Sequence, residues 1–290
     1  MVELEQLRFV RLRPDDLAQA ADFAIRVLGL EPVDRTPEIA TFRSDYRDYT
    51  LSFGQGPALM PSVGLEVRYS SGLDAAEKAL GQLGLPTGRG SAEDCALRKV
   101  KDMVWFTDFS GNRFELVVRP LNTGWRYFPS RDAGIRGLAD VLIRSTDVEK
   151  DLTIWTNVFD AKVRDWAGDA AYLGFDDAHH RIAFFPAERP GILAVEYAVE
   201  DVNLLMRNHY VLRDLQVPVV HGPGRRPASD QLFLTFAGPA DVLFSFVAEG
   251  ANISPTHRPR QFPAGPKGLC GWGSDCRVKE FNALANGQTL

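Results

Sequence analysis

Two adjacent histidines, His179 and His180, are separated by one arginine from IAFFP, an apolar run with the composition of a buried strand. Imidazole changes its charge closer to neutral pH than any other side chain, so a histidine in a pocket can act as an acid or a base. Consecutive side chains on a strand point to opposite faces, and we therefore expect only one of the two rings to face a given pocket. Residue type alone favours a buried ring that is satisfied by a backbone carbonyl.

Asp140 is a carboxylate in the middle of an apolar stretch, between Leu138 and Leu142. A buried carboxylate is costly unless it is paired or takes part in chemistry. Asp140 is therefore either a catalytic group or the partner of an arginine from GPGRRP, which is Arg225 or Arg226. The same arginines could bind a substrate carboxylate or phenolate with two hydrogen bonds, or they could lie in a solvated loop.

Other polar residues near these motifs have both structural and functional interpretations. His221 stands just before a Gly-Pro-Gly turn and is typical of a residue that stabilises a loop. Tyr172 and Tyr197 could donate a hydrogen bond to a substrate oxygen, although aromatic residues on strands more often belong to a core. Residues 229–231, Ser-Asp-Gln, have the composition of a turn and cap.

Composition excludes several classes of function. The 290 residues carry a net charge of -5 without a block of consecutive Lys or Arg, which argues against a nucleic-acid or membrane surface. No apolar run has the length of a membrane span or a signal peptide, so we expect a cytoplasmic protein. The three cysteines, Cys95, Cys270 and Cys276, do not form a disulfide framework, and the last two lack the further ligands of a zinc site.

An internal repeat organises the elements that position these residues. Residues 7–34 align with residues 138–165, an offset of 131 residues, with Leu7 on Leu138 and Arg13 on Arg144. Each copy is predicted to contain a strand, an amphipathic helix and three short strands, followed by another strand, a second helix and two closing strands.

The repeat predicts two similar domains and a tail. We expect an N-terminal domain at residues 1–122, a Gly- and Pro-containing linker at 123–137 and a C-terminal domain at 138–250. Residues 251–290 are rich in Pro and Gly but contain aromatic residues, and we expect them to form a tail that packs on the body.

Several stretches resemble one family. The segments DFSGNRFELV, GLADVLIRSTDVEKDLTIWTNVFDAKV, DAHHRIAFFP and VPVVHGPGRRPASDQLFLTF resemble the two-domain type I extradiol ring-cleavage dioxygenases of the vicinal oxygen chelate superfamily, over about residues 5–250. The resemblance implies an α+β fold of tandem βαβββ modules, with two modules in each of two domains. It also implies an active-site pocket in the C-terminal domain, a role in aromatic catabolism and a homo-oligomer.

The chain departs from the family at the metal ligands. The resemblance implies Fe(II) or Mn(II) held by two histidines and a glutamate, and the corresponding positions here are Asp140, Ala194 and Ser245. The position of the family's active-site tyrosine holds Thr235, and that of its late-loop histidine holds Arg226. We therefore expect no cofactor, with Fe(II) only in a non-standard site.

The resemblance also assigns roles to the remaining residues. His180 matches the family's acid–base histidine, which makes His180 and Asp140 the candidate catalytic pair, and His179 matches its neighbour. A non-standard metal site would combine Asp140 with His180 or Glu196. The candidate substrate-binding residues are Arg225, Arg226, His221, Tyr172, Thr235, Ser245 and Ala194.

Three functions follow, in order of preference. The first is a metal-independent enzyme of aromatic catabolism, an isomerase, hydrolase, lyase or oxygenase, that acts on a small aromatic or ring-derived carboxylate. In this enzyme His180 is the acid or base, Asp140 its charge partner and Arg226 the anion clamp. The second is an extradiol dioxygenase with an unconventional iron site. The third is a catalytically silent relative that binds an aromatic ligand.

Overall fold

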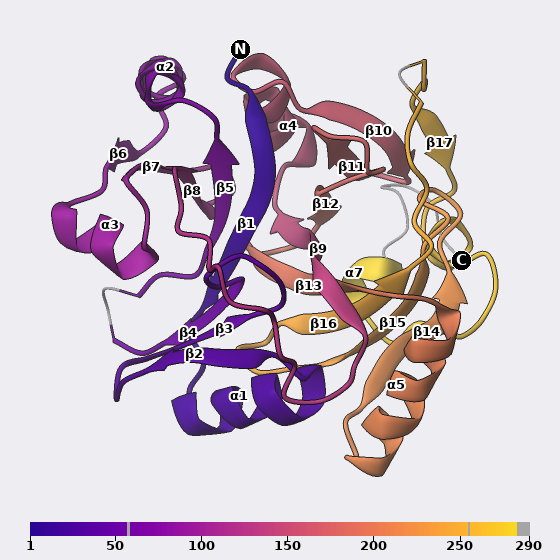
Figure 1. Cartoon of the computed structure of the whole chain (residues 1–290). Coiled ribbons are helices and arrows are strands. Elements are labelled where there is room, and N and C mark those ends of the chain that lie inside the picture. Colours follow the sequence, from indigo (N-terminus) through magenta and orange to yellow (C-terminus); the bar gives the residue numbers. More distant parts are fainter. Residues whose placement is uncertain (57–58, 255, 283–290) are drawn as a thin grey trace. The chain divides into compact units, whose positions relative to one another are not determined.

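The protein is described by a computed structural model, which covers residues 1–56, 59–254 and 256–282 (Figure 1). It divides into two compact units. Unit 1 comprises Met1–Arg131 and Glu149–Ala161, and unit 2 comprises Asp132–Val148 and Lys162–Leu290. Each unit is built around one mixed β-sheet.

Unit 1 contains two βαβββ modules. The first module has β1 (Leu4–Leu12), α1 (Leu17–Phe23) with a π-helical turn η1 (Ala24–Leu28), β2 (Glu31–Arg35), β3 (Ile39–Arg43) and β4 (Leu51–Gly54). The second module has β5 (Ser62–Val67), α2 (Ser70–Gln82), β6 (Thr87–Arg89), α3 (Ala92–Arg98), β7 (Asp102–Thr107) and β8 (Arg113–Val118). The strands form one sheet in the order β2-β3-β4-β1-β5-β8-β7-β6, so the modules meet at the antiparallel pair β1 and β5.

The same arrangement recurs in the second half of the chain. The third module has β9 (Ile135–Ser145), α4 (Val148–Asn157), β10 (Lys162–Ala167), β11 (Ala170–Gly174) and β12 (Ile182–Pro186). The fourth module has β13 (Gly191–Val199), α5 (Val202–Asp214), β14 (Val219–Arg225), β15 (Leu232–Ala237) and β16 (Leu243–Ala248). With the later strand β17 (Arg260–Phe262), the sheet order is β14-β15-β16-β13-β9-β12-β11-β10-β17, and the two modules meet at the antiparallel pair β9 and β13.

Local signals explain the element boundaries. The Asp16 side chain accepts a hydrogen bond from the Gln19 backbone N–H at 2.9 Å and caps α1, and Asp201 caps α5 in the same way through Leu204.

The tandem βαβββ fold expected from the sequence is confirmed. The second helix of each copy is followed by three strands rather than two. The sequence did not reveal β6, which has only three residues, or β14, which contains the Gly-Pro-Gly segment expected to form a turn. Strand β9 begins at Ile135, inside the segment that the sequence suggested as a linker.

The C-terminal segment of unit 2 packs against the third module. Strand β17 (Arg260–Phe262) pairs in parallel with β10 and extends the sheet. Helices α6 (Pro266–Leu269) and α7 (Lys279–Asn282) follow. The ring centroids of Phe281 on α7 and Phe185 on β12 lie 5.1 Å apart. The last part of the predicted tail, residues 283–290, lies outside the described residues.

Each unit has its own apolar core. In unit 1 the fully buried Trp155 packs edge-on to Phe114, with ring centroids 4.9 Å apart. In unit 2 a cluster of buried side chains, among them Leu142, Tyr172 and Phe185, lies beside the strands that carry the polar residues discussed next. Among the described residues, no helix has the length and apolar character needed to cross a membrane.

Candidate metal centre

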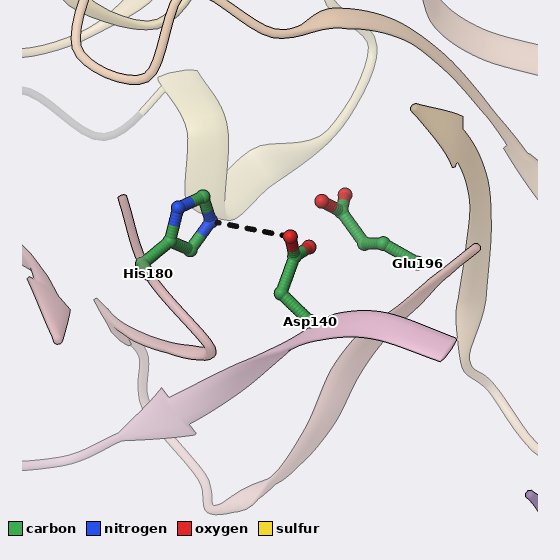
Figure 2. A group of neighbouring side chains, drawn as sticks. All are labelled: Asp140, His180 and Glu196. Atoms are coloured by element: carbon green, nitrogen blue, oxygen red, sulfur yellow. Dashed lines mark ion pairs between the residues drawn. The ribbon is translucent and has the colours of Figure 1, made fainter. Parts of the chain in front are cut away.

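Three buried side chains converge in unit 2: Asp140, His180 and Glu196 (Figure 2). Asp140 lies on β9 and Glu196 lies opposite it on β13, whereas His180 comes from the segment that leads into β12, the other neighbour of β9. Each residue offers one ligating atom, and these atoms lie within 4.8 Å of one another. The meeting of two modules at β9 and β13 thus places three potential ligands around one point.

The strand register identifies the residue that faces Asp140. Glu196 pairs across the sheet with Asp140 on one side and with Ser245 on the other. Ala194, which we expected at the second ligand position, instead pairs with Leu142 and Leu243. Glu196, two residues further along β13, is thus the residue of this strand that lies opposite both Asp140 and Ser245. A register shift between Ile192 and Ala194 is recorded in this strand pair, and irregularities of this kind cannot be placed from sequence.

Glu196 is held by a buried arginine. The two terminal nitrogens of Arg226 donate to the two carboxylate oxygens of Glu196 at 2.6 and 2.5 Å. Burial, and then the nearby charge of Asp140, raise the pKa of Glu196 to about 7, although Arg226 opposes this shift. Arg226 thus pairs with Glu196, and not with Asp140 as one interpretation of the sequence suggested.

Gln231 links the two carboxylates. Its side-chain N–H donates to Oδ2 of Asp140 at 3.0 Å, and its carbonyl oxygen accepts a hydrogen bond from Arg226, also at 3.0 Å. The sequence suggested that Gln231 belongs to a turn and cap. In the structure it follows the turn at residues 227–229 and directly precedes β15, with its side chain directed inward. No signal in the sequence distinguishes this orientation from an ordinary turn residue.

His179 and His180 both point inward, contrary to our expectation of opposite faces. They lie in a bend that precedes β12, so the alternation of a strand does not apply to them. Their Nδ1 atoms are 3.1 Å apart, and Nε2 of His179 lies 2.8 Å from Oδ2 of the buried Asp165 on β10. Burial lowers the pKa of both rings, that of His180 far below its ordinary value, so both rings are neutral at pH 7.

Two atoms of the cluster lack a hydrogen-bond partner in the described structure. They are Oδ1 of Asp140 and Nε2 of His180, and both are buried. The latter lies 3.9 Å from Oδ2 of Asp140, which is too long for a hydrogen bond but suits two ligands of one ion. Metal bonds to oxygen and nitrogen are about 2.0 to 2.2 Å long, so ligands of one ion lie at most about 4.4 Å apart. The cluster therefore needs only a slight contraction to hold a metal ion.

The other candidate site residues are distributed around this cluster. Tyr172 packs edge-on to His180 at 4.9 Å, and burial raises its pKa. Burial lowers the pKa of His221 to about 4, and its Nε2 has no hydrogen-bond partner among the described residues. The hydroxyl groups of Thr235 and Ser245 bond to each other at 2.9 Å on neighbouring strands.

Arg225 lies apart from the cluster. Its guanidinium pairs with Glu249 at 2.6 Å and with Asp230 at 3.2 Å near the surface. The adjacent Arg226, the first residue after β14, is buried, and its guanidinium is bonded to Glu196. Of the two arginines, the structure therefore brings only Arg226 to the candidate centre.

Two cavities in unit 2 border the cluster. A groove of about 480 Å³ is lined by residues that include Asp140, His180, Gln231, Arg136 and Arg181. This volume is within the range of small-molecule sites. The second cavity, beside Tyr172, His221, Arg226 and Phe281, has only about 10 Å³, roughly the space of one water molecule. An aromatic ring could reach the cluster through the groove but would not fit the second cavity as it stands.

Comparison with known proteins identifies homologues. The chain is 28% identical over 218 residues to a 3-methylcatechol 2,3-dioxygenase of Pseudomonas putida. The aligned region covers 70% of this chain and 74% of that protein. It is 26% identical over 236 residues to an iron-dependent extradiol dioxygenase of Rhodococcus jostii, covering 71% of this chain and 77% of that protein. No family model matches the chain.

Solved structures share the fold over nearly the whole chain. A halotolerant catechol dioxygenase has a TM-score of 0.87 at 17% identity, with 96% of this chain and 97% of that chain covered. A Mn(II)-bound glyoxalase from Novosphingobium aromaticivorans also has a TM-score of 0.87, at 21% identity, with coverage of 99% and 97%.

These findings correct one expectation from the sequence. We expected no cofactor, because the histidine and glutamate ligands were missing from their positions. That expectation is wrong: a homologue is iron-dependent, and this chain gathers Asp140, His180 and Glu196 into a possible metal site. The chain has the two-domain vicinal oxygen chelate fold, and the homologues named above and several of its structural neighbours are extradiol dioxygenases of that superfamily.

Proposed function

We propose that this protein is a metal-dependent oxygenase of the extradiol type that acts on a catechol-like aromatic substrate. Asp140, His180 and Glu196 would hold a divalent ion such as Fe(II) or Mn(II). The single observation that carries the proposal is the convergence of these three buried side chains, two of which present ligating atoms without a hydrogen-bond partner. Related proteins supply the reaction class.

The donor set favours particular metals. One imidazole and two carboxylates form a harder ligand set than two imidazoles and one carboxylate, which suits Mn(II) and Fe(II) better than softer ions. Glu196 can still act as a ligand while it is paired with Arg226, because an ionised carboxylate has about four lone-pair positions and Arg226 uses two of them.

The charges of the site favour an anionic substrate. Asp140 and Glu196 carry two negative charges when ionised, and Arg226 offsets one of them. Burial makes the remaining negative charge unfavourable, which is consistent with the raised pKa of Glu196. A bound divalent ion would leave the site with one net positive charge. A catechol that has lost a proton matches that charge.

The residues of the chain then have separate tasks. Asp140, His180 and Glu196 would hold the metal, which would supply Lewis acidity toward the substrate oxygens and access to electron transfer with dioxygen. Arg226 holds the carboxylate of Glu196 in a fixed orientation, and Gln231 does the same for Asp140. The groove beside Asp140 and His180 admits the ring, and the apolar side chains behind the cluster exclude bulk water.

Metal reconstitution tests the proposal. The full chain is loaded anaerobically with Fe(II), or with Mn(II) in air, and its metal content is compared with that of Asp140→Asn and of the surface variant Asp214→Asn. We expect about one metal per chain for the wild type and for Asp214→Asn, at least tenfold weaker binding for Asp140→Asn, and oxygen uptake with substituted catechols. A wild-type chain that retains no metal would overturn the proposal.

A catalytically silent relative that binds an aromatic ligand is the second candidate. The observation that favours it is the cavity beside Tyr172 and His221, which side chains including Phe281 reduce to about 10 Å³. A chain that binds catechols and metal but consumes no oxygen under any condition would support this function over the first.

A further inference from the structure

A chain of buried hydrogen bonds runs from β10 to the candidate metal centre. Oδ2 of Asp165 lies 2.8 Å from Nε2 of His179, and Nδ1 of His179 lies 3.1 Å from Nδ1 of His180. Nε2 of His180 then faces Oδ2 of Asp140 at 3.9 Å. Asp165, His179 and His180 are each no more than 2% exposed, so water does not compete for these contacts.

The positions of the protons along this chain follow from its ends. A neutral imidazole has one N–H donor and one acceptor nitrogen. Asp165 can only accept when ionised, so His179 donates through Nε2 and its Nδ1 is left as an acceptor. Between the two Nδ1 atoms the donor must then be His180. The proton of His180 is therefore on Nδ1, and Nε2 presents a lone pair toward Asp140.

We propose that Asp165 and His179 are positioning residues that fix the ring tautomer of His180, so that its Nε2 lone pair is directed at a cation between Asp140 and Glu196. This inference rests on the proposed function for the identity of the cation. A lone pair directed at two carboxylates is repulsive unless a positive charge lies between them. Hydrogen bonding of the distal nitrogen of a ligating histidine generally sets its tautomer and strengthens its metal binding.

The C-terminal segment completes the arrangement. The backbone N–H of Arg260 on β17 donates to Oδ1 of Asp165 at 2.8 Å, and its guanidinium donates to Oδ2 at 2.5 Å. Nε2 of His257 lies 3.2 Å from the same Oδ1. With these donors in place Asp165 is held as a carboxylate, the form that dictates the proton positions in His179 and His180.

A nuclear magnetic resonance measurement on the metal-free full chain tests the tautomer directly. Histidine is labelled with ¹⁵N, and long-range ¹H–¹⁵N correlations report which ring nitrogen carries the proton. The five histidines give five ring patterns, and His180→Asn identifies that of His180. We expect a protonated Nδ1 in His180. A protonated Nε2 would overturn the proposal, and this result does not depend on whether any metal binds.

Variants of His179 test its effect on the metal. His179→Phe keeps a ring but offers no acceptor, and we expect Mn(II) to bind about 10- to 100-fold more weakly, as for other losses of such partners. His179→Asn keeps an acceptor near the position of Nδ1 and is expected to restore binding to within a few-fold of wild type. His209→Phe, on α5, is the matched control with unchanged affinity.

The two proposals fail differently. If wild-type protein binds Mn(II) and His179→Phe binds it equally well, the positioning role is wrong while the proposed function stands. If wild-type protein binds no metal but His180 carries its proton on Nδ1, the metal centre is wrong, and the tautomer assignment to Asp165 and His179 is supported. Electron paramagnetic resonance of free Mn(II) gives the affinities.

Discussion

Replacement of Arg226 by Met removes the positive partner of a buried carboxylate. The Arg226 side chain is 7% exposed and that of Glu196 is fully buried, with contacts of 2.5 and 2.6 Å between them. Unit charges about 4 Å apart attract by about 4 kcal/mol at an effective dielectric constant near 20. Removal of one partner of a buried pair generally lowers the free energy of unfolding by about 3 to 5 kcal/mol, and we expect that loss for metal-free Arg226→Met.

The adjacent arginine provides the control. Arg225 forms ion pairs with partially exposed carboxylates, so Arg225→Met should lower the free energy of unfolding by less than about 1 kcal/mol. Urea denaturation at pH 8 compares the two variants. The double variant Arg226→Met, Glu196→Leu should regain most of the loss, because it leaves no unpaired charge. Equal stability of the two single variants would refute the argument.

The sign of the pH dependence is a further check on the same variant. The pKa of Glu196 in the folded chain is already raised to about 7, and the loss of Arg226 raises it further. A raised pKa in the folded state means that the protonated form is favoured by folding, so the penalty is present at high pH and shrinks as pH falls. A deficit in Arg226→Met that is as large at pH 5 as at pH 8 would contradict this account.

Three other predictions concern both units. Below the Glu196 pKa of about 7, a proton competes with Mn(II) for the carboxylate, so Mn(II) affinity should fall by up to about tenfold per pH unit below pH 7. An Mn(II) affinity that does not change from pH 8 to pH 6 would contradict this. Burial and the charge of Asp151 raise the pKa of Asp108 to about 6, so its ionised form is unfavourable in the folded chain. Asp108→Asn should therefore raise the free energy of unfolding at pH 8 and change it little at pH 4, and calorimetry at the two pH values measures this. Trp155→Ala should lower the unfolding free energy of unit 1 by about 3 to 5 kcal/mol, because it leaves a cavity beside Phe114, and a loss below 1 kcal/mol would show that the site collapses.

Much of the fold could be predicted from the sequence because its signals are local or periodic. The 131-residue repeat, the alternation in β4 and β8 and the start of α1 at Asp16 depend on neighbours in the chain. Strand β6 was missed because its three residues are too few to show a period, and β14 was missed because residues 222–224, Gly-Pro-Gly, are typical of a turn.

The site was predicted only in part. Asp140 and His180 were identified because a carboxylate in an apolar strand and a histidine beside one are conspicuous in sequence. Glu196 was considered only as an alternative, and Asp165 was not considered, since neither residue stands out from its neighbours. His179 was assigned to the opposite face because we treated a bend as part of β12.

The sequence by itself determined the modules, their order and which acidic, basic and imidazole side chains are available in the second half of the chain. Tertiary structure decided which of those groups meet. The contacts between Asp140 and Glu196, and between Arg226 and Glu196, join residues 56 and 30 positions apart, through a strand register that contains irregularities. Metal binding at the centre depends on the distances between these side chains and on the tautomer of His180, which Asp165 sets through His179. Both are properties of the folded chain and not of any one segment.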